Sequence, residues 1–480
     1  MAESPLQIPA PPHDLPRTLG DLRASGWKSV PVSVELRRNA AAKIADGGPL
    51  IEGVLGFEDT VIPQLENALL AGHDVILLGE RGQAKTRLIR SLVSLLDEWL
   101  PVVTGSEIND DPYAPTSRFA RLTVADGGDE TPINWIHRSD RYGEKLATPD
   151  TSIADLIGEV DPIKVAEGRY LSDELAIHYG LVPRVNRGIF AINELPDLAE
   201  RIQVGLLNVL EERDVQIRGH RIRLPIDVVL VATANPEDYT NRGRIITPLK
   251  DRFGAQIRTH YPPTTRIEAA IMISEAVVPA GGPTVSVPAY LAEVVAEMSQ
   301  LARKSPHLNQ RSGVSVRLTI ANYETLVANS VRRALRTGEP VAVPRVSDFA
   351  ALVSSTQGKI EVEALEEGRE AEVVTQLVSA AILAVFRRRV TLADPAAVIS
   401  SFDAEVVVHA GDDLAAAEYL AVLADLPALE PPTRALAGPE ASESPALLAS
   451  ALEFLLEGLH LTKRLNKDAS GSRALYRSRT

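Results

Sequence analysis

The 480-residue chain contains no cysteine, which excludes disulfide bonds, thiolate metal sites and cysteine nucleophiles. Aromatic residues make up only 4% of the chain, whereas alanine and leucine are frequent, and this composition favours helix-rich packing. No run approaches the roughly 18 apolar residues of a membrane-spanning helix, and the N-terminus lacks the basic-then-apolar order of a signal peptide. We therefore expect a soluble cytoplasmic protein that does not engage membranes.

The chain also has fewer positively than negatively charged residues, and its formal net charge is −14. This balance argues against a protein whose whole surface is shaped for phosphate backbones, so we do not expect nucleic acid as the main partner. Hydrophobic residues at 45% and charged residues at 24% are ordinary for a globular protein. The length exceeds what one hydrophobic core usually serves, so two or three domains are expected.

Composition and periodicity divide the chain into segments. We expect a partly disordered N-terminal extension (1–45), an α/β core (46–262), a helical domain (263–362), a helical C-terminal region (363–426), a proline-rich linker (427–446), and a C-terminal helix with a basic tail (447–480). In the core, strand-like runs alternate with helical stretches, as a parallel sheet with crossover helices requires. Those runs are HDVILLG, RFARLTV, GIFAIN and DVVLVATAN.

Two helices are expected around the first strand of the core. FEDTVIPQLENALLAG predicts a helix that Asp59 or Thr60 caps and Gly72 ends. TRLIRSLVSLLDEWL, which follows the strand in the sequence, predicts an amphipathic helix.

A glycine loop lies between the strand HDVILLG and the helix that follows it. Backbone N–H groups of such a loop can turn around phosphates, a lysine can reach the β- and γ-phosphates, and a hydroxyl at the helix start can bind Mg²⁺. Ala84 stands where the usual glycine precedes the lysine. An accidental glycine turn before a helix is the alternative for this segment alone. The predicted nucleotide-binding residues are Gly79, Glu80, Arg81, Gly82, Gln83, Ala84, Lys85 and Thr86.

Two later strands end in polar residues that suit nucleotide hydrolysis. GIFAIN is followed by Glu194, which could polarise an attacking water, and ends in Asn193, where a second acid would help to hold Mg²⁺. DVVLVATAN ends in Asn235, which could orient that water. Alone, the first segment would be a core strand ending in a solvated glutamate, and the second an Asn-Pro turn.

Two arginines complete the set of candidate residues. Arg252 in LKDRF could reach a neighbouring subunit's γ-phosphate, and Arg317 in GVSVRLT could couple hydrolysis to movement of the helical domain. A surface salt bridge and a solvated arginine are the respective alternatives. The order and spacing of all these elements are more specific than any one of them.

The ordered set resembles the AAA+ ATPases, in the clade of the magnesium chelatase I subunit and the MoxR ATPases. The GxxGxAKT loop, alanine included, is similar to the MoxR form. Residues 151–194 look like an insert in the second helix of that clade, and 211–225 like its hairpin before sensor 1. The resemblance covers about residues 50–360. It implies an α/β AAA+ P-loop core, a parallel sheet flanked by helices, with a helical lid and a mostly helical C-terminal extension.

The resemblance also implies roles. Lys85 and Thr86 are expected to bind ATP and Mg²⁺, Glu194 to act as the Walker B base, Asn235 as sensor 1, and Arg317 as sensor 2. Arg252 is expected to act as a finger across the interface of a homo-oligomeric ring, a hexamer in this clade. The ring would remodel a partner protein that carries a von Willebrand factor A domain. Chelatase activity follows by analogy only, because no tetrapyrrole pocket is evident.

Asn193 departs from the aspartate of the family, since an amide is neutral and donates where a carboxylate only accepts. We expect Asn193 to contact Mg²⁺ only through a water on the ion, and on the sequence alone Asn193→Asp is expected to lower the Mg²⁺ requirement or raise turnover.

Other functional classes stay open beside the ring ATPase. A scaffold that binds nucleotide without hydrolysing it is the main alternative, because of Asn193. A nucleic-acid motor could use the basic hairpin residues Arg218, His220, Arg221 and Arg223. A bacterial transcription activator would need a GAFTGA loop, and the sequence has none. The basic C-terminal tail is expected to be a solvated end, so deletion beyond Asn466 is predicted to leave ATPase activity within about twofold.

Overall fold

The chain forms two compact units, Met1–His260 (unit 1) and Tyr261–Thr480 (unit 2), each with its own buried apolar core. The computed structural model describes residues 9–161, 163, 166, 174–211, 214–216, 223–235, 244–309, 313–362, 368–402, 406–439, 444–470 and 473–479. The units divide close to the boundary expected between the α/β core and the helical domain.

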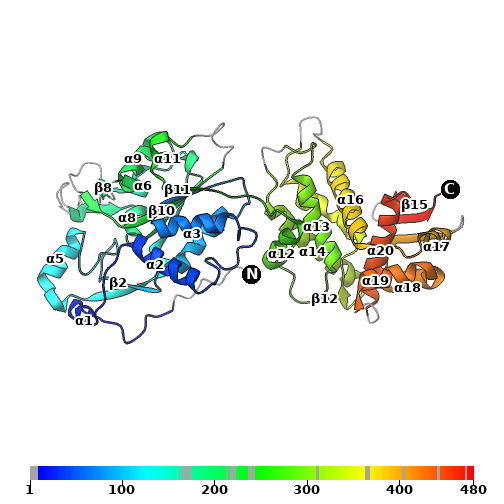
Figure 1. Cartoon of the computed structure of the whole chain (residues 1–480), viewed down its shortest axis with the longest axis horizontal. Coiled ribbons are helices and arrows are strands. Elements are labelled where there is room, and N and C mark those ends of the chain that lie inside the picture. Colours follow the sequence, from blue (N-terminus) through cyan, green and yellow to red (C-terminus); the bar gives the residue numbers. More distant parts are fainter. Residues whose placement is uncertain are drawn as a thin grey trace. The chain divides into compact units, whose positions relative to one another are not determined.

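Unit 1, coloured blue to green in Figure 1, is built on a five-stranded sheet in the order β11-β1-β10-β7-β4, with every neighbouring pair parallel. The strands are β1 (Val75–Leu78), β4 (Tyr142–Leu146), β7 (Gly188–Asn193), β10 (Val228–Ala234) and β11 (Ala255–Arg258). Neighbours in the sheet are not neighbours in the chain, so crossover connections join them. The predicted α/β fold with a parallel sheet is confirmed.

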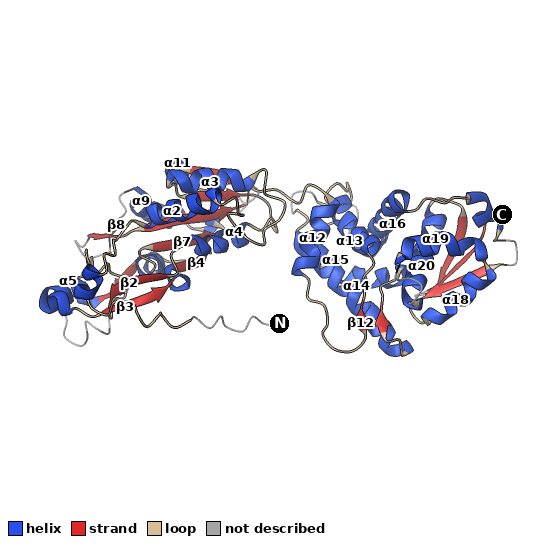
Figure 2. Ribbon diagram, turned by 60° about the horizontal axis from the view of Figure 1, so that its bottom comes forward, coloured by secondary structure: helices blue, strands red, loops and turns tan. Residues whose placement is uncertain are grey.

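Both faces of this sheet are buried, which explains why its central strands are apolar throughout. On β10, Leu230 packs in a cluster with residues of α9 (Glu200–Glu211) and α11 (Thr247–Arg252). The next residue, Val231, packs on the other face with α2 (Val32–Ala45) and α3 (Val61–Ala71). The strand period of two therefore builds a three-layer core. Figure 2 shows β7 and β4 side by side in this sheet.

The helices beside β1 agree with the predictions in part. Helix α3 ends at Gly72 in a left-handed conformation, as expected. The side chain of Thr60 does not cap this helix; its hydroxyl contacts the Nε2 atom of His260 at 2.7 Å. After β1, α4 (Lys85–Ser91) and a 3₁₀ turn (Leu92–Leu95) are shorter than predicted, because the chain then leaves the helix to pair β2 (Trp99–Val103) with β3 (Ile133–His137).

The strand predicted at RFARLTV is wrong, because this segment is helix α5 (Arg118–Gly127). The Ser117 side chain accepts a hydrogen bond from the Ala120 N–H and caps the helix start. Alternating apolar residues in so short a run fit a helix as well as a strand, and the serine before it decides between them. Phe119 and Leu122 of this helix are exposed.

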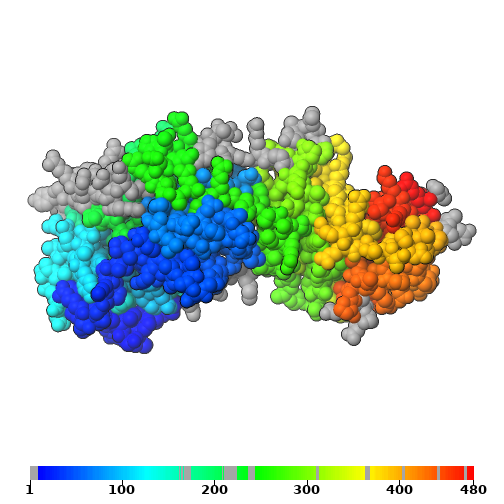
Figure 3. All heavy atoms as spheres, in the orientation of Figure 1, coloured from blue at the N-terminus to red at the C-terminus, as the bar shows by residue number. Residues whose placement is uncertain are grey.

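The N-terminal extension is part of unit 1. Helix α1 (Leu19–Ala24) buries Leu19 and Leu22, and the indole N–H of Trp135 on β3 donates to the carbonyl of Pro16. In the space-filling view of Figure 3, the N-terminal segment in blue forms a continuous surface with the rest of this unit. The disorder expected for the first residues falls in part on residues 1–8, outside the described residues.

The hairpin predicted at residues 211–225 is observed at the end where its two strands enter and leave. Strands β8 (Asp214–Gln216) and β9 (Arg223–Pro225) pair antiparallel, with Val215 opposite Leu224. Its basic tip, residues 217–222, lies outside the described residues. The insert predicted at 151–194 contains α6 (Ile153–Leu156), β5 (Gly158–Val160), β6 (Ile177–Tyr179) and α8 (Leu181–Arg184), and β5 pairs antiparallel with β6.

Unit 2 is mainly helical around one apolar cluster. Its helices are α12 (Thr265–Glu275), α13 (Ala289–Ala302), α14 (Val316–Thr337), α15 (Leu352–Gln357), α16 (Glu370–Arg389), α17 (Pro395–Ser400), α18 (Ala416–Asp425), α19 (Glu430–Ala437) and α20 (Pro445–Leu461). Two short strands, β12 (Thr284–Val285) and β13 (Val341–Ala342), pair parallel. Helix α20 is buried along most of its length.

Two expectations for the C-terminal part of unit 2 need correction. Part of the expected linker is helix α19, where Thr433 is buried, and Leu429 directly before this helix is buried as well. The expected solvated tail forms β15 (Leu465–Ser470) and β16 (Arg473–Ser478), and β16 pairs with both β15 and β14 (Val407–Gly411) in an antiparallel sheet. Tyr476 is buried there because alternate residues of β16 face the core.

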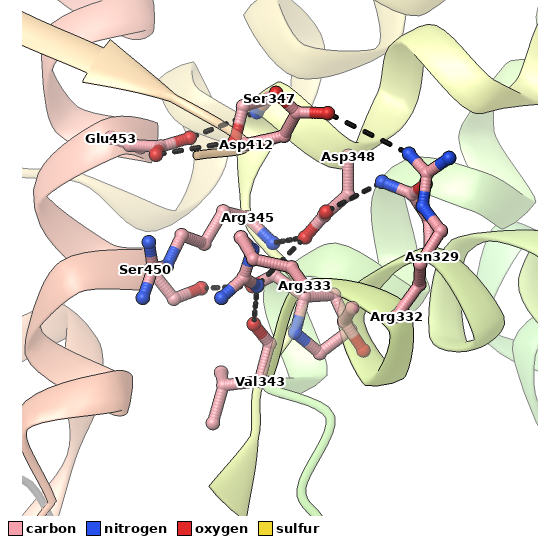
Figure 4. Close-up of polar contacts among 12 residues, drawn as sticks. Asn329, Arg332, Arg333, Val343, Arg345, Ser347, Asp348, Asp412, Ser450 and Glu453 are labelled. Carbon is pink, nitrogen blue, oxygen red and sulfur yellow. Dashed lines mark hydrogen bonds and ion pairs between the residues drawn. The ribbon is translucent and has the colours of Figure 1, made fainter. Parts of the chain in front are cut away.

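A network of polar contacts runs through the expected helical lid and reaches the C-terminal helix α20 (Figure 4). Arg333 on α14 donates to the Asp348 carboxylate at 3.0 Å and to the Val343 carbonyl at 2.6 Å. The Ser347 N–H donates to Glu453 on α20 at 2.8 Å. The expected lid and the expected C-terminal helix therefore belong to one unit. Within the parts of the chain that the structure describes, no helix combines the length and the apolar character needed to cross a bilayer.

Candidate functional site

The glycine loop between β1 and α4 has the backbone that its sequence predicts. Gly82 has φ +74°, which favours glycine, and a Cβ added to Gly79 would lie 2.0 Å from the Thr259 hydroxyl, which leaves no room for a side chain there. Ala84 also adopts the left-handed region, at φ +55° and ψ +17°. An L-residue with a Cβ is strained there by about 1–2 kcal/mol. The alanine therefore keeps the backbone of the usual glycine, and the loop stores the strain.

Lys85, the first residue of α4, is buried and held by three acceptors. Its ammonium donates to the carbonyls of Gly79 and Glu80, the latter at 2.7 Å, and to Asn235 Oδ1 at 2.7 Å. An ammonium has three protons, so a phosphate that binds Lys85 must displace or share one of these acceptors. The structure thus brings together the predicted loop lysine and the predicted sensor at the end of β10.

Asn235 also contacts Glu194. The Asn235 Nδ2 atom donates to Glu194 Oε2 at 2.8 Å, and the backbone N–H of Glu194 donates to the Thr233 hydroxyl. Glu194 lies just after β7 with φ +58°, a backbone conformation that a bulky residue adopts only when the surroundings hold it. One amide therefore links the loop lysine to the predicted base, through its oxygen on one side and its nitrogen on the other.

Asn193, the last residue of β7, faces the hydroxyl of Thr86. Thr86 Oγ1 lies 3.4 Å and Thr233 Oγ1 3.2 Å from Asn193 Oδ1, both long for hydrogen bonds. The other end of the amide makes a short contact, because Nδ2 donates to Glu144 Oε1 at 2.5 Å. The residues predicted for the Mg²⁺ side of the site, Thr86 and Asn193, are thus adjacent.

Glu144 on β4 is the residue of this site that sequence reasoning missed. Arg90 donates to both of its oxygens, at 2.8 and 3.1 Å, and the Tyr142 hydroxyl donates to it at 2.9 Å. Partial burial raises the pKa of Glu144, but the hydrogen bonds from Arg90 and Tyr142 outweigh it, so the net pKa is lowered. Its strand, YGEKL, is short and half polar. The feature of the sequence that could have revealed it is a glutamate in the short segment YGEKL, which forms the strand next to GIFAIN.

Each of the two predicted arginines makes a local hydrogen bond. The Nη1 atom of Arg252 donates to the Pro248 carbonyl within α11. Arg317 belongs to unit 2, where it is exposed in the first turn of α14 and its N–H donates to the Ser315 hydroxyl. The roles of both residues remain predictions.

The donor set suits a nucleotide with Mg²⁺. Thr86, Asn193 and the nearby carboxylates offer oxygen atoms, which are the ligands that Mg²⁺ prefers, and backbone N–H groups of the loop suit phosphate. Among the described residues no three His, Asp or Glu side chains are grouped to hold a metal ion. An ion here would accordingly depend on phosphate oxygens and water as well as on the Thr86 hydroxyl.

Parts of the chain match known proteins. Residues 167–252 match the family model of the Sigma-54 interaction domain. The chain is 31% identical over 232 residues (46% of the chain) to the magnesium-chelatase subunit ChlI of a Nostoc strain. It is 31% identical over 208 residues (42% of the chain) to ChlI of Anabaena variabilis. The matches span 58% and 57% of the length of these relatives.

Solved structures match over a longer part of the chain but less closely. A model of the complex between subunits BchI and BchD of magnesium chelatase covers 67% of this chain and 97% of its own, at 20% identity and a TM-score of 0.33.

Proposed function

We propose that this chain, which belongs to the AAA+ ATPases and is related to the magnesium-chelatase I subunits and MoxR proteins, binds ATP with Mg²⁺ and hydrolyses it. The observation that carries the proposal is the linkage of Lys85, Asn235 and Glu194 beside the phosphate loop. Three elements far apart in the sequence supply a phosphate ligand, a water-orienting amide and a general base, with the amide hydrogen-bonded to the other two.

Each side chain has a definite task in this proposal. The loop N–H groups and Lys85 bind the phosphates, while Thr86 and Asn193 hold Mg²⁺ and its water. The bound ion would neutralise charge that develops on the phosphates. When phosphate replaces Asn235 as an acceptor of Lys85, the Asn235 amide is left with Glu194. Glu194 then takes the proton of the attacking water while Asn235 holds that water in line.

Glu194→Gln separates the ATPase from the nucleotide-binding scaffold. We expect turnover to fall by about 100-fold or more, because a positioned base contributes about 10²–10⁴-fold, while ATP binding persists. Lys85→Ala should lose ATP affinity, with its melting temperature measured beside it because Lys85 is buried and hydrogen-bonded in the loop. Glu130→Gln, at an exposed glutamate of unit 1, is the matched control and should change neither quantity. Unchanged turnover in Glu194→Gln would leave the scaffold as the better assignment.

The oligomeric state forms a further part of the proposal. A homo-oligomeric ring, a hexamer by resemblance, would let Arg252 stabilise charge on a neighbour's nucleotide. Mixing Arg252→Ala chains with Glu194→Gln chains should then restore activity at interfaces that pair an intact Arg252 with an intact Glu194. Silent mixtures, under conditions where subunits exchange, would rule out action in trans. So would a protein that stays monomeric with ATP at micromolar concentration.

The work done by hydrolysis would be the remodelling of a partner protein. The relatives are named as subunits of magnesium chelatase, and this supports a partner on another chain, for which a von Willebrand factor A domain is our candidate. Purification of the hydrolysis-blocked Glu194→Gln form with ATP, followed by identification of the bound protein, tests this. Chelatase activity itself is not proposed. A transcription-activating role is disfavoured, because the sequence lacks the GAFTGA loop despite its Sigma-54 interaction match.

A further inference from the structure

Glu144 and Asn193 lie on neighbouring parallel strands and face the same side of the sheet. Leu146 of β4 is opposite Asn193 of β7, and Glu144 is opposite Ala191. Side chains two residues apart on a strand share a face, so Glu144 is the diagonal neighbour of Asn193. Glu144 Oε1 and Asn193 Nδ2 are 2.5 Å apart. The position without its expected carboxylate therefore has a carboxylate beside it.

The contact fixes which way the Asn193 amide is oriented. An asparagine can present either an oxygen or an NH₂ group, and its neighbours determine the choice. Glu144, as a carboxylate, can only accept, so it selects Nδ2. The hydroxyls of Thr86 and Thr233 can then donate to Oδ1 on the other side. Without Glu144, the amide could turn its NH₂ group toward Thr86, where a Mg²⁺ ligand shell needs acceptors.

The electrostatic balance favours asparagine at this position. Glu144 is already paired with Arg90, which lies one helical turn after Thr86 on α4. Glu144 and Arg90 together are neutral, and Asn193 adds no charge. An aspartate at 193 would place a second carboxylate oxygen close to Glu144 Oε1 in a site where both side chains are largely buried. Two carboxylates this close cannot both ionise without a large penalty.

We propose that Glu144 and Asn193 act as a pair that replaces the single aspartate expected at the end of β7. In this pair Glu144 is the positioning residue: it holds the Asn193 amide with Oδ1 toward Thr86, and its carboxylate, paired with Arg90, lies beside the Mg²⁺ side of the site. The inference rests on the proposed function for its Mg²⁺ role, but the pairing itself does not. It reverses the expectation drawn from the sequence alone, because Asn193→Asp should impair the protein and not improve it.

A charge-swap cycle tests the pair with Asn193→Asp, Glu144→Gln and the double variant. The readouts are the melting temperature without nucleotide or Mg²⁺, and the affinity for a fluorescent ATP analogue with Mg²⁺ and with EDTA. Each single variant should melt lower than wild type and lose about tenfold in Mg²⁺-dependent affinity, the size of one charge-assisted hydrogen bond. The double variant should recover both quantities, because the amide and the carboxylate have only exchanged places. Glu130→Gln should match wild type throughout.

Several results would overturn the pairing. One is an Asn193→Asp variant that melts and binds like wild type while Glu144 is intact. Another is a double variant whose losses equal the sum of the single losses. If Asn193→Asp does not fold, the double variant decides: a folded double variant supports the pair, and a double variant that does not fold refutes it. If wild type binds the analogue no better than Lys85→Ala, the proposed function fails, and the melting temperatures still decide the pairing.

Discussion

The N-terminal extension is held to the sheet by a buried ion pair, and this pair gives a prediction with a calculable size. Glu35 of α2 and Arg141, next to the start of β4, are 2% and 0% exposed. The guanidinium donates to both Glu35 oxygens, at 2.8 and 2.6 Å, and also to the Arg187 carbonyl. Glu35 accepts a further hydrogen bond from the Asp97 N–H at 2.6 Å. Among the described residues, both charges are thus satisfied by each other and by backbone groups.

Glu35→Gln removes the negative charge and keeps the volume of the side chain. Breaking a buried ion pair on one side costs about 3–5 kcal/mol, because the remaining charge stays buried without compensation. Glutamine keeps one acceptor, so we expect the lower end, about 3 kcal/mol. The matched control is Arg38→Ala on the same helix. Arg38 pairs with Asp97 where the side chains are 55% and 42% exposed, and such pairs contribute less than about 1 kcal/mol.

Urea unfolding followed by tryptophan fluorescence measures the loss in unit 1 alone, because the only tryptophans of the chain are Trp27, Trp99 and Trp135. We expect a lower midpoint for Glu35→Gln with an unchanged slope, and a much smaller shift for Arg38→Ala. The double variant Glu35→Leu/Arg141→Met should recover part of the loss, since two apolar side chains leave no buried charge. Equal shifts for Glu35→Gln and Arg38→Ala would refute the reasoning.

Two further predictions concern the loop and the C-terminal sheet. Ala84→Gly should raise the stability of unit 1 by up to about 1 kcal/mol, since relief of left-handed strain exceeds the added entropy of the unfolded chain; a lower urea midpoint would contradict this. Truncation after Asn466 removes Tyr476 and Lys467, which both donate to the buried Glu457 carboxylate. We therefore expect unit 2 to become sensitive to limited proteolysis while tryptophan fluorescence of unit 1 stays unchanged. If unit 2 of the truncated protein resists proteolysis as well as it does in wild type, the tail is dispensable for the fold of this unit.

The sequence was most informative where a residue type has one physical task. Gly79 and Gly82 marked the phosphate loop because a side chain at Gly79 would clash with Thr259 and the left-handed backbone at Gly82 favours glycine, and the apolar runs of β1, β7 and β10 marked strands buried on both faces. Local chemistry of this kind does not depend on distant partners. The end of α3 at Gly72 followed for the same reason.

The sequence was least informative where the outcome depends on contacts between distant segments. The seven residues RFARLTV fit either period, and the cap at Ser117 made them a helix. YGEKL is a strand because it pairs with β7, and its polar residues gave no sign in the sequence that it belongs to the buried sheet. The C-terminal tail looked like a solvated end because its many basic residues are conspicuous, whereas its burial depends on single residues such as Tyr476.

The same argument applies to Asn193. Its chemistry cannot be judged from its own strand, because the charge that a family aspartate would carry is found on β4. The Arg141–Glu35 pair lies next to the start of β4, and the same guanidinium binds the carbonyl of Arg187, the residue before β7. One buried arginine thus fixes the strand that carries Glu144 relative to the strand that carries Asn193. If this reasoning is correct, Glu35→Gln should weaken Mg²⁺-dependent nucleotide affinity as well as stability, although α2 supplies none of the residues that we assign to the nucleotide.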